Sequence, residues 1–419
     1  TTHQLYTVMM LSSGQAYGSL RQNGTISIPS SASNRDRPFW SPRVALLGVF
    51  FLFLGAFLGF SLASKKNVQT GSSADYSRAK SLILPESNVS DTLSLPRSCN
   101  ELLTLTFGDG FCQPTEEISV LSIRGLELVY YQYSAGQMAQ VYEGVTPLIV
   151  INGGPGFSHN YLLTLKQQAC YYGRTIIFYD QVGTGRSSRP TMADAPWLGT
   201  EDYYVEELRS LIAELNLSEV FVLGHSWGSV VSLWYALEQP PELKGLVLAG
   251  ALSDAQLYAA SQLTNNLATI PPHMLSFLVE TEQNQKYGPD YDKLSTHLEG
   301  LFTVRTYPIP SCLQKEGFDS YNKEIYQAWQ GPSEFQLSGL LMGYNVTARL
   351  SSILAPTLIT HGAFDTITPP VVNVLHAHIK DSRVRTYAHS GHITMIDDVE
   401  AYNNDVAEFL KKIDDGDVW

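Results

Sequence analysis

The chain has 419 residues, of which 44% are hydrophobic and 16% charged, and its formal net charge is −13. This length suits one large α/β domain with an insertion, or two domains, and an aromatic content of 11% argues against a largely disordered protein. The acidic balance argues against a nucleic-acid partner, because phosphate binding requires concentrated lysine and arginine.

The N-terminal part divides into three segments by composition. Residues 1–43 form a polar tail without a sustained hydrophobic period, and residues 44–63 (VALLGVFFLFLGAFLGFSLA) contain no charged side chain. A helix of this length rises about 1.5 Å per residue and spans a hydrocarbon core of roughly 30 Å. We therefore predict a single transmembrane helix at 44–63, with a buried core helix as the alternative, followed by a linker at 64–95.

The orientation of this predicted membrane protein is indicated by its glycosylation sequons. Lysines and arginines occur on both sides of the span, so their distribution does not orient it. Asn-x-Ser/Thr sequons occur at Asn23, Asn88, Asn216 and Asn345, and three of them follow the span. This pattern favours a lumenal or extracellular location for the C-terminal part.

The four cysteines are Cys99, Cys112, Cys170 and Cys312, and no two of them have the spacing of metal ligands. We therefore predict no metal site. Cys99 and Cys112 bracket a short glycine-containing segment, and a disulfide between them is one of two open hypotheses if the domain is lumenal. Buried free thiols are the alternative.

Short apolar runs that alternate with helical stretches make up most of the remaining chain. The runs are 118–122, 126–133, 147–151, 175–179, 219–224, 244–249, 357–361 and 383–388, and the helical stretches include 201–215, 227–239 and 398–412. This alternation predicts an α/β fold with a mostly parallel sheet buried on both faces, built from residues 96–252 and 350–419. Residues 253–349 have helical patterns interrupted by prolines and no clear strand, which predicts an inserted helical cap.

The sequence Gly224-His225-Ser226-Trp227-Gly228 follows one predicted strand and precedes a predicted helix. A nucleophile on such a sharp turn requires small neighbours, so Ser226 is the predicted nucleophile. The backbone N–H of Trp227 then lies at a helix start, where it can donate to an oxyanion. The glycine loop 152–156 follows the strand at 147–151, and we expect a second donor from it.

A serine nucleophile requires a general base, which an acid must orient. In α/β folds that carry a serine nucleophile on such a strand-to-helix turn, the three catalytic residues follow one another along the chain in the order serine, acid, histidine. Asp365 and His392 follow the predicted strands at 357–361 and 383–388, so both belong at the same sheet edge as Ser226. We predict His392 as the base and Asp365 as the acid. Epoxide hydrolase and dehalogenase chemistry is disfavoured, because those enzymes use a carboxylate as the nucleophile.

Several longer segments together carry a family resemblance. They are NGGPGFSHNYL (152–162), YDQVGTGRSS (179–188), GHSWGS (224–229), GPSEFQLSG (331–339), GAFDTITP (362–369) and SGHITM (390–395). From about residue 120 to residue 412, the chain resembles the proline iminopeptidase family of α/β-hydrolases, including the tricorn-interacting aminopeptidases. The resemblance implies release of an N-terminal residue, often proline, from short peptides, without a cofactor.

The resemblance also implies roles for individual residues. Ser226, Asp365 and His392 match the family's catalytic triad, Gly154 and Trp227 match its oxyanion donors, and Glu334 matches an acid that binds the substrate α-amine.

The chain departs from the family at two positions near these residues. Asn152 stands where the family usually has histidine, and Thr366 stands where the tricorn-interacting members have a second glutamate. The loss of that acid would broaden the substrates, so a hydrolase of non-peptide esters, lactones or amides remains the alternative to an aminopeptidase. A non-catalytic binding module is disfavoured, because it predicts a degraded triad.

Overall fold

The computed structural model describes residues 98–107, 112–135, 144–313 and 321–417. The predicted tail at 1–43, the predicted transmembrane helix at 44–63 and the linker at 64–95 lie outside these described residues. Within the described ranges, no helix is both long enough and apolar enough to cross a membrane.

One sheet of eight strands forms the framework, in the order β1-β2-β4-β3-β5-β6-β7-β8. The strands are β1 (Thr115–Ile123), β2 (Leu126–Ser134), β3 (Leu148–Ile151), β4 (Ile176–Tyr179), β5 (Val220–His225), β6 (Leu243–Ala249), β7 (Thr357–Gly362) and β8 (Ser382–Tyr387). β2 pairs antiparallel with β1 and β4, and all other neighbours are parallel. The predicted mostly parallel sheet is therefore confirmed.

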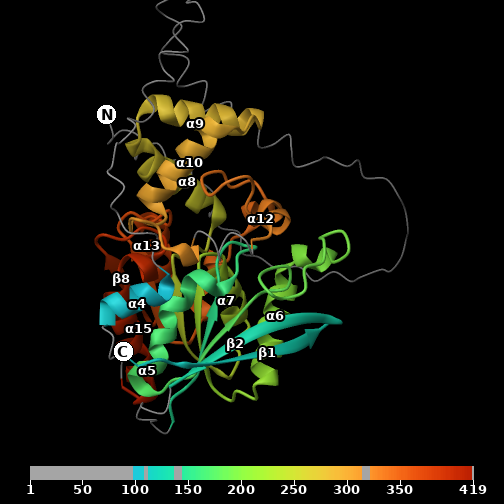
Figure 1. Ribbon diagram of the computed structural model, residues 1–419, viewed down its shortest axis with the longest axis vertical. Helices are drawn as coiled ribbons and strands as arrows, with labels where there is room; N and C mark the ends of the chain where they lie inside the picture. Colours follow the sequence, from blue (N-terminus) through green and yellow to red (C-terminus); the bar gives the residue numbers. More distant parts are fainter. Residues whose placement is uncertain (1–97, 108–111, 136–143, 314–320, 418–419) are drawn as a thin grey trace, which may run out of the picture. The chain divides into compact units, whose positions relative to one another are not determined.

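Helices cover both faces of this sheet (Figure 1). They are α4 (Cys99–Phe107), η2 (His159–Gln167), α5 (Gln168–Tyr172), η3 (Pro196–Gly199), α6 (Glu201–Glu214), α7 (Trp227–Leu237), α13 (Pro369–His378), α14 (Thr394–Asp397) and α15 (Val399–Asp414). Alternate residues of β3 enter different hydrophobic clusters: Ile149 and Ile151 face α6 and α7, whereas Leu148 and Val150 face α15. The strand is thus apolar throughout because both of its faces are buried.

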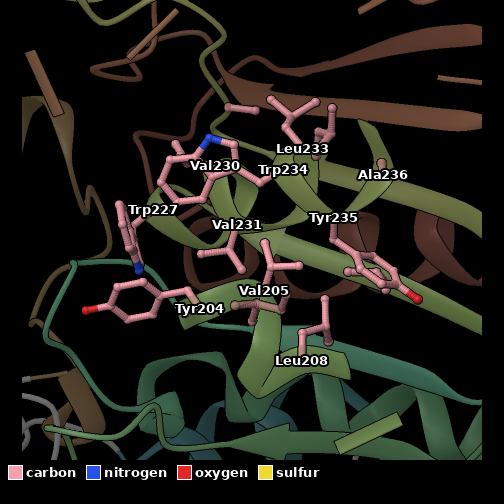
Figure 2. Packing of buried hydrophobic residues seen from close by; sticks show 14 of the residues in the cluster. Tyr204, Val205, Leu208, Trp227, Val230, Val231, Leu233, Trp234, Tyr235 and Ala236 are labelled. Carbon is pink, nitrogen blue, oxygen red and sulfur yellow. The ribbon is translucent and has the colours of Figure 1, made fainter. Parts of the chain in front are cut away.

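The first of these clusters fixes the helix that follows Ser226. Figure 2 shows Val205 and Leu208 of α6 in the same cluster of buried side chains as Val231 of α7. Each fully buried side chain of this size stabilises the fold by about 1.5–3 kcal/mol. This packing anchors α7, and therefore the turn at its N-terminus, to the sheet.

The segment between β6 and β7 contains helices joined by loops, and no strand of the sheet lies among its described residues. It contains α8 (Ala255–Asn265), η4 (Leu267–Thr269), α9 (Pro272–Asn284), α10 (Pro289–Phe302), α12 (Lys323–Trp329), η6 (Leu340–Gly343) and η7 (Thr347–Ser352). The Asp254 carboxylate accepts hydrogen bonds from two backbone N–H groups and so caps α8, while prolines begin α9 and α10. Leu278, Leu294 and Leu298 belong to a small hydrophobic core within this insertion.

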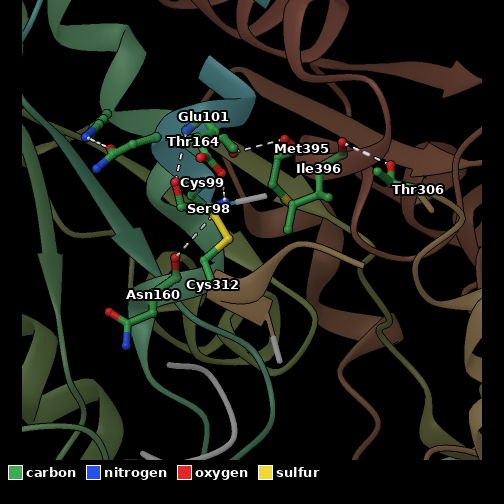
Figure 3. The surroundings of a disulfide bond; sticks show 11 residues. Ser98, Cys99, Glu101, Asn160, Thr164, Thr306, Cys312, Met395 and Ile396 are labelled. Atoms are coloured by element: carbon green, nitrogen blue, oxygen red, sulfur yellow. Dashed lines mark hydrogen bonds between the residues drawn. A yellow bond between two sulfur atoms is a disulfide. The ribbon is translucent and has the colours of Figure 1, made fainter. Parts of the chain in front are cut away.

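The predicted Cys99–Cys112 disulfide is wrong, and so is the alternative of free thiols. Cys99 bonds to Cys312, and Cys112 bonds to Cys170. The segment after Cys99 is not a loop but the helix α4, whose nine residues carry the chain about 12 Å away from Cys99. A disulfide requires Cα atoms within about 7 Å, so the far end of α4 is out of reach of Cys99, and the two cysteines do not bracket a simple loop. Figure 3 shows the Cys99–Cys312 bond among segments from four regions of the chain.

Candidate active site

Ser226 occupies a strained turn between β5 and α7. Its φ of 54° and ψ of −119° lie in a region that residues other than glycine rarely adopt. A Cβ at Gly224 would lie 2.2 Å from the Gly228 carbonyl oxygen, and a Cβ at Gly228 would lie 2.2 Å from the Ile151 carbonyl oxygen. Both flanking glycines are therefore required because backbone passes directly against them.

The turns after β7 and β8 bring an acid and a base together. His392 Nδ1 lies 2.6 Å from Asp365 Oδ1, which also accepts the Ile367 N–H at 2.7 Å. His392 Nε2 makes no hydrogen bond within the described part of the chain, and the His392 side chain lines the same pocket as Ser226. Ser226 and His392 can thus exchange a proton when a bound substrate brings them within hydrogen-bonding distance.

The electrostatic surroundings make His392 a stronger base. Burial alone lowers the pKa of His392, but the carboxylates of Asp365 and Glu334 outweigh burial and raise it above its usual value. These carboxylates stabilise the imidazolium that forms when the base takes a proton.

Two backbone N–H groups near Ser226, one in the next residue and one in the glycine loop, are candidate donors to an oxyanion. Trp227 is the first residue of α7, so its N–H has no preceding helical turn to bond to. In the glycine loop, the Gly153 N–H donates to the Tyr161 hydroxyl at 2.6 Å, whereas the next residue, Gly154, lines the pocket. The arrangement can hold an oxyanion between the N–H groups of Gly154 and Trp227.

The pocket in front of these groups has a volume of about 290 Å³ and is shared between the sheet edge and the insertion. Aromatic side chains form one wall, where the ring centroids of Phe157 and Tyr321 are 4.8 Å apart and those of Tyr321 and Tyr326 are 5.5 Å apart. Among the described residues that line the pocket there are two carboxylates, Glu299 and Glu334, and no lysine or arginine. The pocket therefore favours a cationic group on its ligand.

Glu334 is held by three hydroxyl groups. Tyr258 and Thr366 donate to its Oε1 at 3.0 and 3.3 Å, and Tyr326 donates to Oε2 at 3.3 Å. Burial raises the pKa of Glu334, and the negative charge of Asp365 adds to this effect, whereas His392 and the hydroxyl groups oppose it. A carboxylate in these surroundings gains from pairing with a cation.

Glu299, on α10, is a pocket residue that the sequence analysis missed. It accepts a hydrogen bond from the Ser295 hydroxyl at 3.1 Å, and its pKa is raised by burial and further by the charge of Glu334. No sequence signal separates Glu299 from the exposed acids of the insertion, because only the packing of α10 over the sheet edge brings it to the pocket.

The two departures from the family pattern have structural explanations. Asn152 is fully buried, and its Nδ2 donates to the Phe157 carbonyl oxygen at 2.7 Å, so it closes the glycine loop from outside the pocket. Thr366 is also fully buried and supports Glu334 through its hydroxyl. Although Asn152 and Thr366 are uncharged, the pocket still contains two carboxylates, those of Glu299 and Glu334.

Comparisons with known proteins agree with this geometry. A family model described as alpha/beta hydrolase fold matches residues 146–399. A proline iminopeptidase of Lactobacillus helveticus is 34% identical over 274 residues, covering 64% of this chain and 91% of the relative. A proline iminopeptidase of Thermoplasma volcanium is 31% identical over 267 residues, covering 63% of this chain and 88% of the relative.

Similarity to a solved structure covers a larger share of the chain. The crystal structure of a proline iminopeptidase from Mycobacterium smegmatis has a TM-score of 0.66 and 26% identity, covering 72% of this chain and 99% of that chain. With a sheet, a nucleophile turn and an acid–histidine pair in these positions, the protein is a hydrolase of the α/β-hydrolase fold. Within that fold, the chain belongs to the proline iminopeptidase family.

Proposed function

We propose that the protein is a serine aminopeptidase that releases an N-terminal proline, or another small residue, from short peptides through an acyl-enzyme. The observation that carries this proposal is the pair of carboxylates, Glu299 and Glu334, in the pocket that also contains Ser226 and His392. The names of the relatives, which are proline iminopeptidases, support the same substrate class.

Ser226 and His392 perform the bond-breaking steps in this proposal. The Ser226 hydroxyl gives its proton to His392 Nε2 while its oxygen attacks the carbonyl carbon of the first peptide bond. His392 then protonates the nitrogen of the departing peptide, the C–N bond breaks, and the first residue stays bound to Ser226 as an ester. A water molecule gives a proton to His392 and attacks this ester, which releases the free amino acid and restores Ser226.

The tetrahedral intermediates carry a negative charge on the former carbonyl oxygen. The N–H groups of Gly154 and Trp227 are the donors for this oxyanion, and removing one such donor typically costs about 10²–10³ in rate. Asp365 keeps Nδ1 of His392 protonated, so that Nε2 is the nitrogen that takes the proton.

The two carboxylates make the enzyme an exopeptidase. A protonated α-amine of the substrate pairs with Glu299 and Glu334 and places the first peptide bond at Ser226. A substrate with a blocked N-terminus would bury both carboxylates without a cation, which is unfavourable. Selection for an N-terminal residue thus follows from the charge of the pocket.

Steady-state hydrolysis of chromogenic amides tests the proposal. Prolyl and alanyl amides are compared with their N-acetylated forms and with a simple ester, with Ser226→Ala as the blank. We expect a strong preference for the free-amine prolyl amide. Equal rates on blocked and free substrates, or activity on the ester alone, would contradict the aminopeptidase and favour the alternative hydrolase of esters, lactones or amides.

For the location of the protein, we propose an oxidising compartment outside the cytosol, with membrane attachment through residues 44–63. The two disulfides take up all four cysteines, and such bonds persist in oxidising compartments. The sequon residues Asn216 and Asn345 are both exposed.

Glycosylation on gels tests this location. We expect Asn216→Gln and Asn345→Gln each to remove a glycan shift on gels, and Asn23→Gln, before the span, to change nothing. Unglycosylated protein with reduced thiols in cells would contradict this location.

A further inference from the structure

One chain of hydrogen bonds joins the three loops that carry the proposed catalytic groups. The Gly153 N–H donates to the Tyr161 hydroxyl oxygen at 2.6 Å, and this hydroxyl lies 2.7 Å from His225 Nδ1. His225 Nε2 lies 3.0 Å from the His392 carbonyl oxygen. The chain therefore links the glycine loop after β3, the nucleophile turn after β5 and the histidine turn after β8.

The end groups determine the direction of every hydrogen bond in this chain. A carbonyl oxygen only accepts, so His225 Nε2 carries the proton and donates to His392. His225 Nδ1 is then unprotonated and accepts from the Tyr161 hydroxyl, whose oxygen in turn accepts from the Gly153 N–H. Tyr161 and His225 each take part in two of the three hydrogen bonds, so rotation of either side chain breaks two of them.

Both side chains stay neutral in their surroundings. Burial, together with the nearby His392, lowers the pKa of His225 to about 3, and burial raises the pKa of Tyr161. The ring centroids of His225 and His392 are only 4.7 Å apart. A neutral His225 therefore does not oppose the imidazolium that forms on His392 during catalysis, as a charged residue there would.

The packing around these three hydrogen bonds is tight. A Cβ at Gly153 would lie 2.8 Å from the Tyr161 hydroxyl, 2.9 Å from the Ser226 Cβ and 3.0 Å from His225 Nδ1. Tyr161 and His225 are only 4% and 2% exposed. Both side chains border the pocket, but their polar atoms are engaged within the protein.

We propose that Tyr161 and His225 are positioning residues that align the oxyanion loop and the general base with Ser226. They act through the Gly154 N–H and the His392 imidazole, which depend on the placement of Gly153 and of the His392 backbone. The inference rests on the serine-hydrolase chemistry of the proposed function, but not on its preference for a free amine.

The test compares three variants with the wild-type chain on a simple ester and on the prolyl amide. Tyr161→Phe removes the hydroxyl in the middle of the chain, and His225→Leu removes both ring nitrogens. We expect kcat to fall about 10- to 100-fold in each, because a misplacement on the order of 1 Å costs this much, while KM stays within about twofold. In His225→Gln the amide again supplies one donor and one acceptor, so we expect most of kcat to return.

Tyr131→Phe is the matched control. Tyr131 is as buried as Tyr161, and its hydroxyl donates to Asp180 at 2.9 Å, outside the pocket. We expect this variant to lose thermal stability without a change in kcat. A similar fall of kcat in Tyr131→Phe, or equal losses in His225→Leu and His225→Gln, would overturn the positioning role.

Labelling with a fluorophosphonate separates this inference from the proposed function. If the wild-type chain is not labelled at Ser226, the serine-hydrolase proposal itself fails. If the wild-type chain is labelled and Tyr161→Phe is labelled at the same rate, only the positioning role fails. We expect labelling to be slower in Tyr161→Phe and in His225→Leu, because the reagent also places an oxygen in the oxyanion hole.

Discussion

The sheet edge and the helical insertion contribute to the pocket in different ways. Ser226, Asp365 and His392 each lie on a short turn directly after a strand, and backbone hydrogen bonds and close glycine contacts hold these turns. Glu299 and Glu334 belong to the insertion, which packs around a small core of its own. The sheet edge thus supplies the chemistry in our proposal, and the insertion supplies the selection of substrate. Four predictions test this division.

The largest effect is expected from Ser226→Ala, which removes the nucleophile from the sheet edge. We expect kcat/KM to fall by at least about 10³-fold, and equally for the free-amine amide and the ester. Steady-state kinetics on both substrates check this. Retention of activity on either substrate would show that another group performs the attack.

Glu334→Gln removes a charge from the insertion and replaces no residue of the sheet edge. We expect kcat/KM for the free-amine amide to fall at least about 30-fold, as is typical when a buried charge pair loses one partner, while hydrolysis of the simple ester persists. Glu299→Gln should act in the same direction. Glu280→Gln, an exposed acid on α9, is the control and should leave both activities unchanged. Equal losses on the ester and the amide would mean that the two regions do not divide the work as proposed.

The pH dependence of activity reports an electrostatic coupling between the insertion and the sheet edge. The Glu334 carboxylate of the insertion contributes to the raised pKa of His392. His392 must be neutral to accept a proton, so kcat/KM falls as pH falls through its pKa. Removing the Glu334 charge lowers that pKa, and the acid limb for the ester should move to lower pH in Glu334→Gln. A limb that does not move, or that moves to higher pH, would contradict this coupling.

The smallest effect on activity is expected at the Cys99–Cys312 disulfide. Ile309 and Leu313 line the pocket on the segment that contains Cys312. Replacing both cysteines with serine should raise KM for peptide substrates by a few fold and lower stability by about 2–4 kcal/mol. The matched change at Cys112 and Cys170, which do not line the pocket, should lower stability alone. Thermal unfolding and KM measurements separate the two outcomes, and equal KM values in both variants would contradict a role in the pocket wall.

The residues of the sheet edge could be predicted because their signals are local. An apolar run, a turn and the next helix occupy consecutive positions, and parallel strands bring their carboxyl ends to one edge. All eight apolar runs form strands, and the turns after β5, β7 and β8 bring Ser226, Asp365 and His392 to one region. The predicted membrane span and tail lie outside the described residues and stay predictions.

Features that depend on contacts between distant segments were not predictable in the same way. The disulfide partners are 213 and 58 residues apart, and the assumption of a local Cys99–Cys112 pair failed because α4 separates the two cysteines. Glu299 carries no local sign of its place in the pocket. The hydrogen bonds through Tyr161 and His225 likewise appear only when three loops meet.

The sequence by itself determined the strands, the turn that carries Ser226 and the chain order of Asp365 and His392. Hydrophobic period and glycine spacing encode these over a few residues. Only the tertiary structure decided the cysteine pairing, the second carboxylate in the pocket and the links between the loops that carry the proposed catalytic groups. These depend on how the insertion packs over the sheet edge, and that packing is set by side-chain shape across large sequence separations.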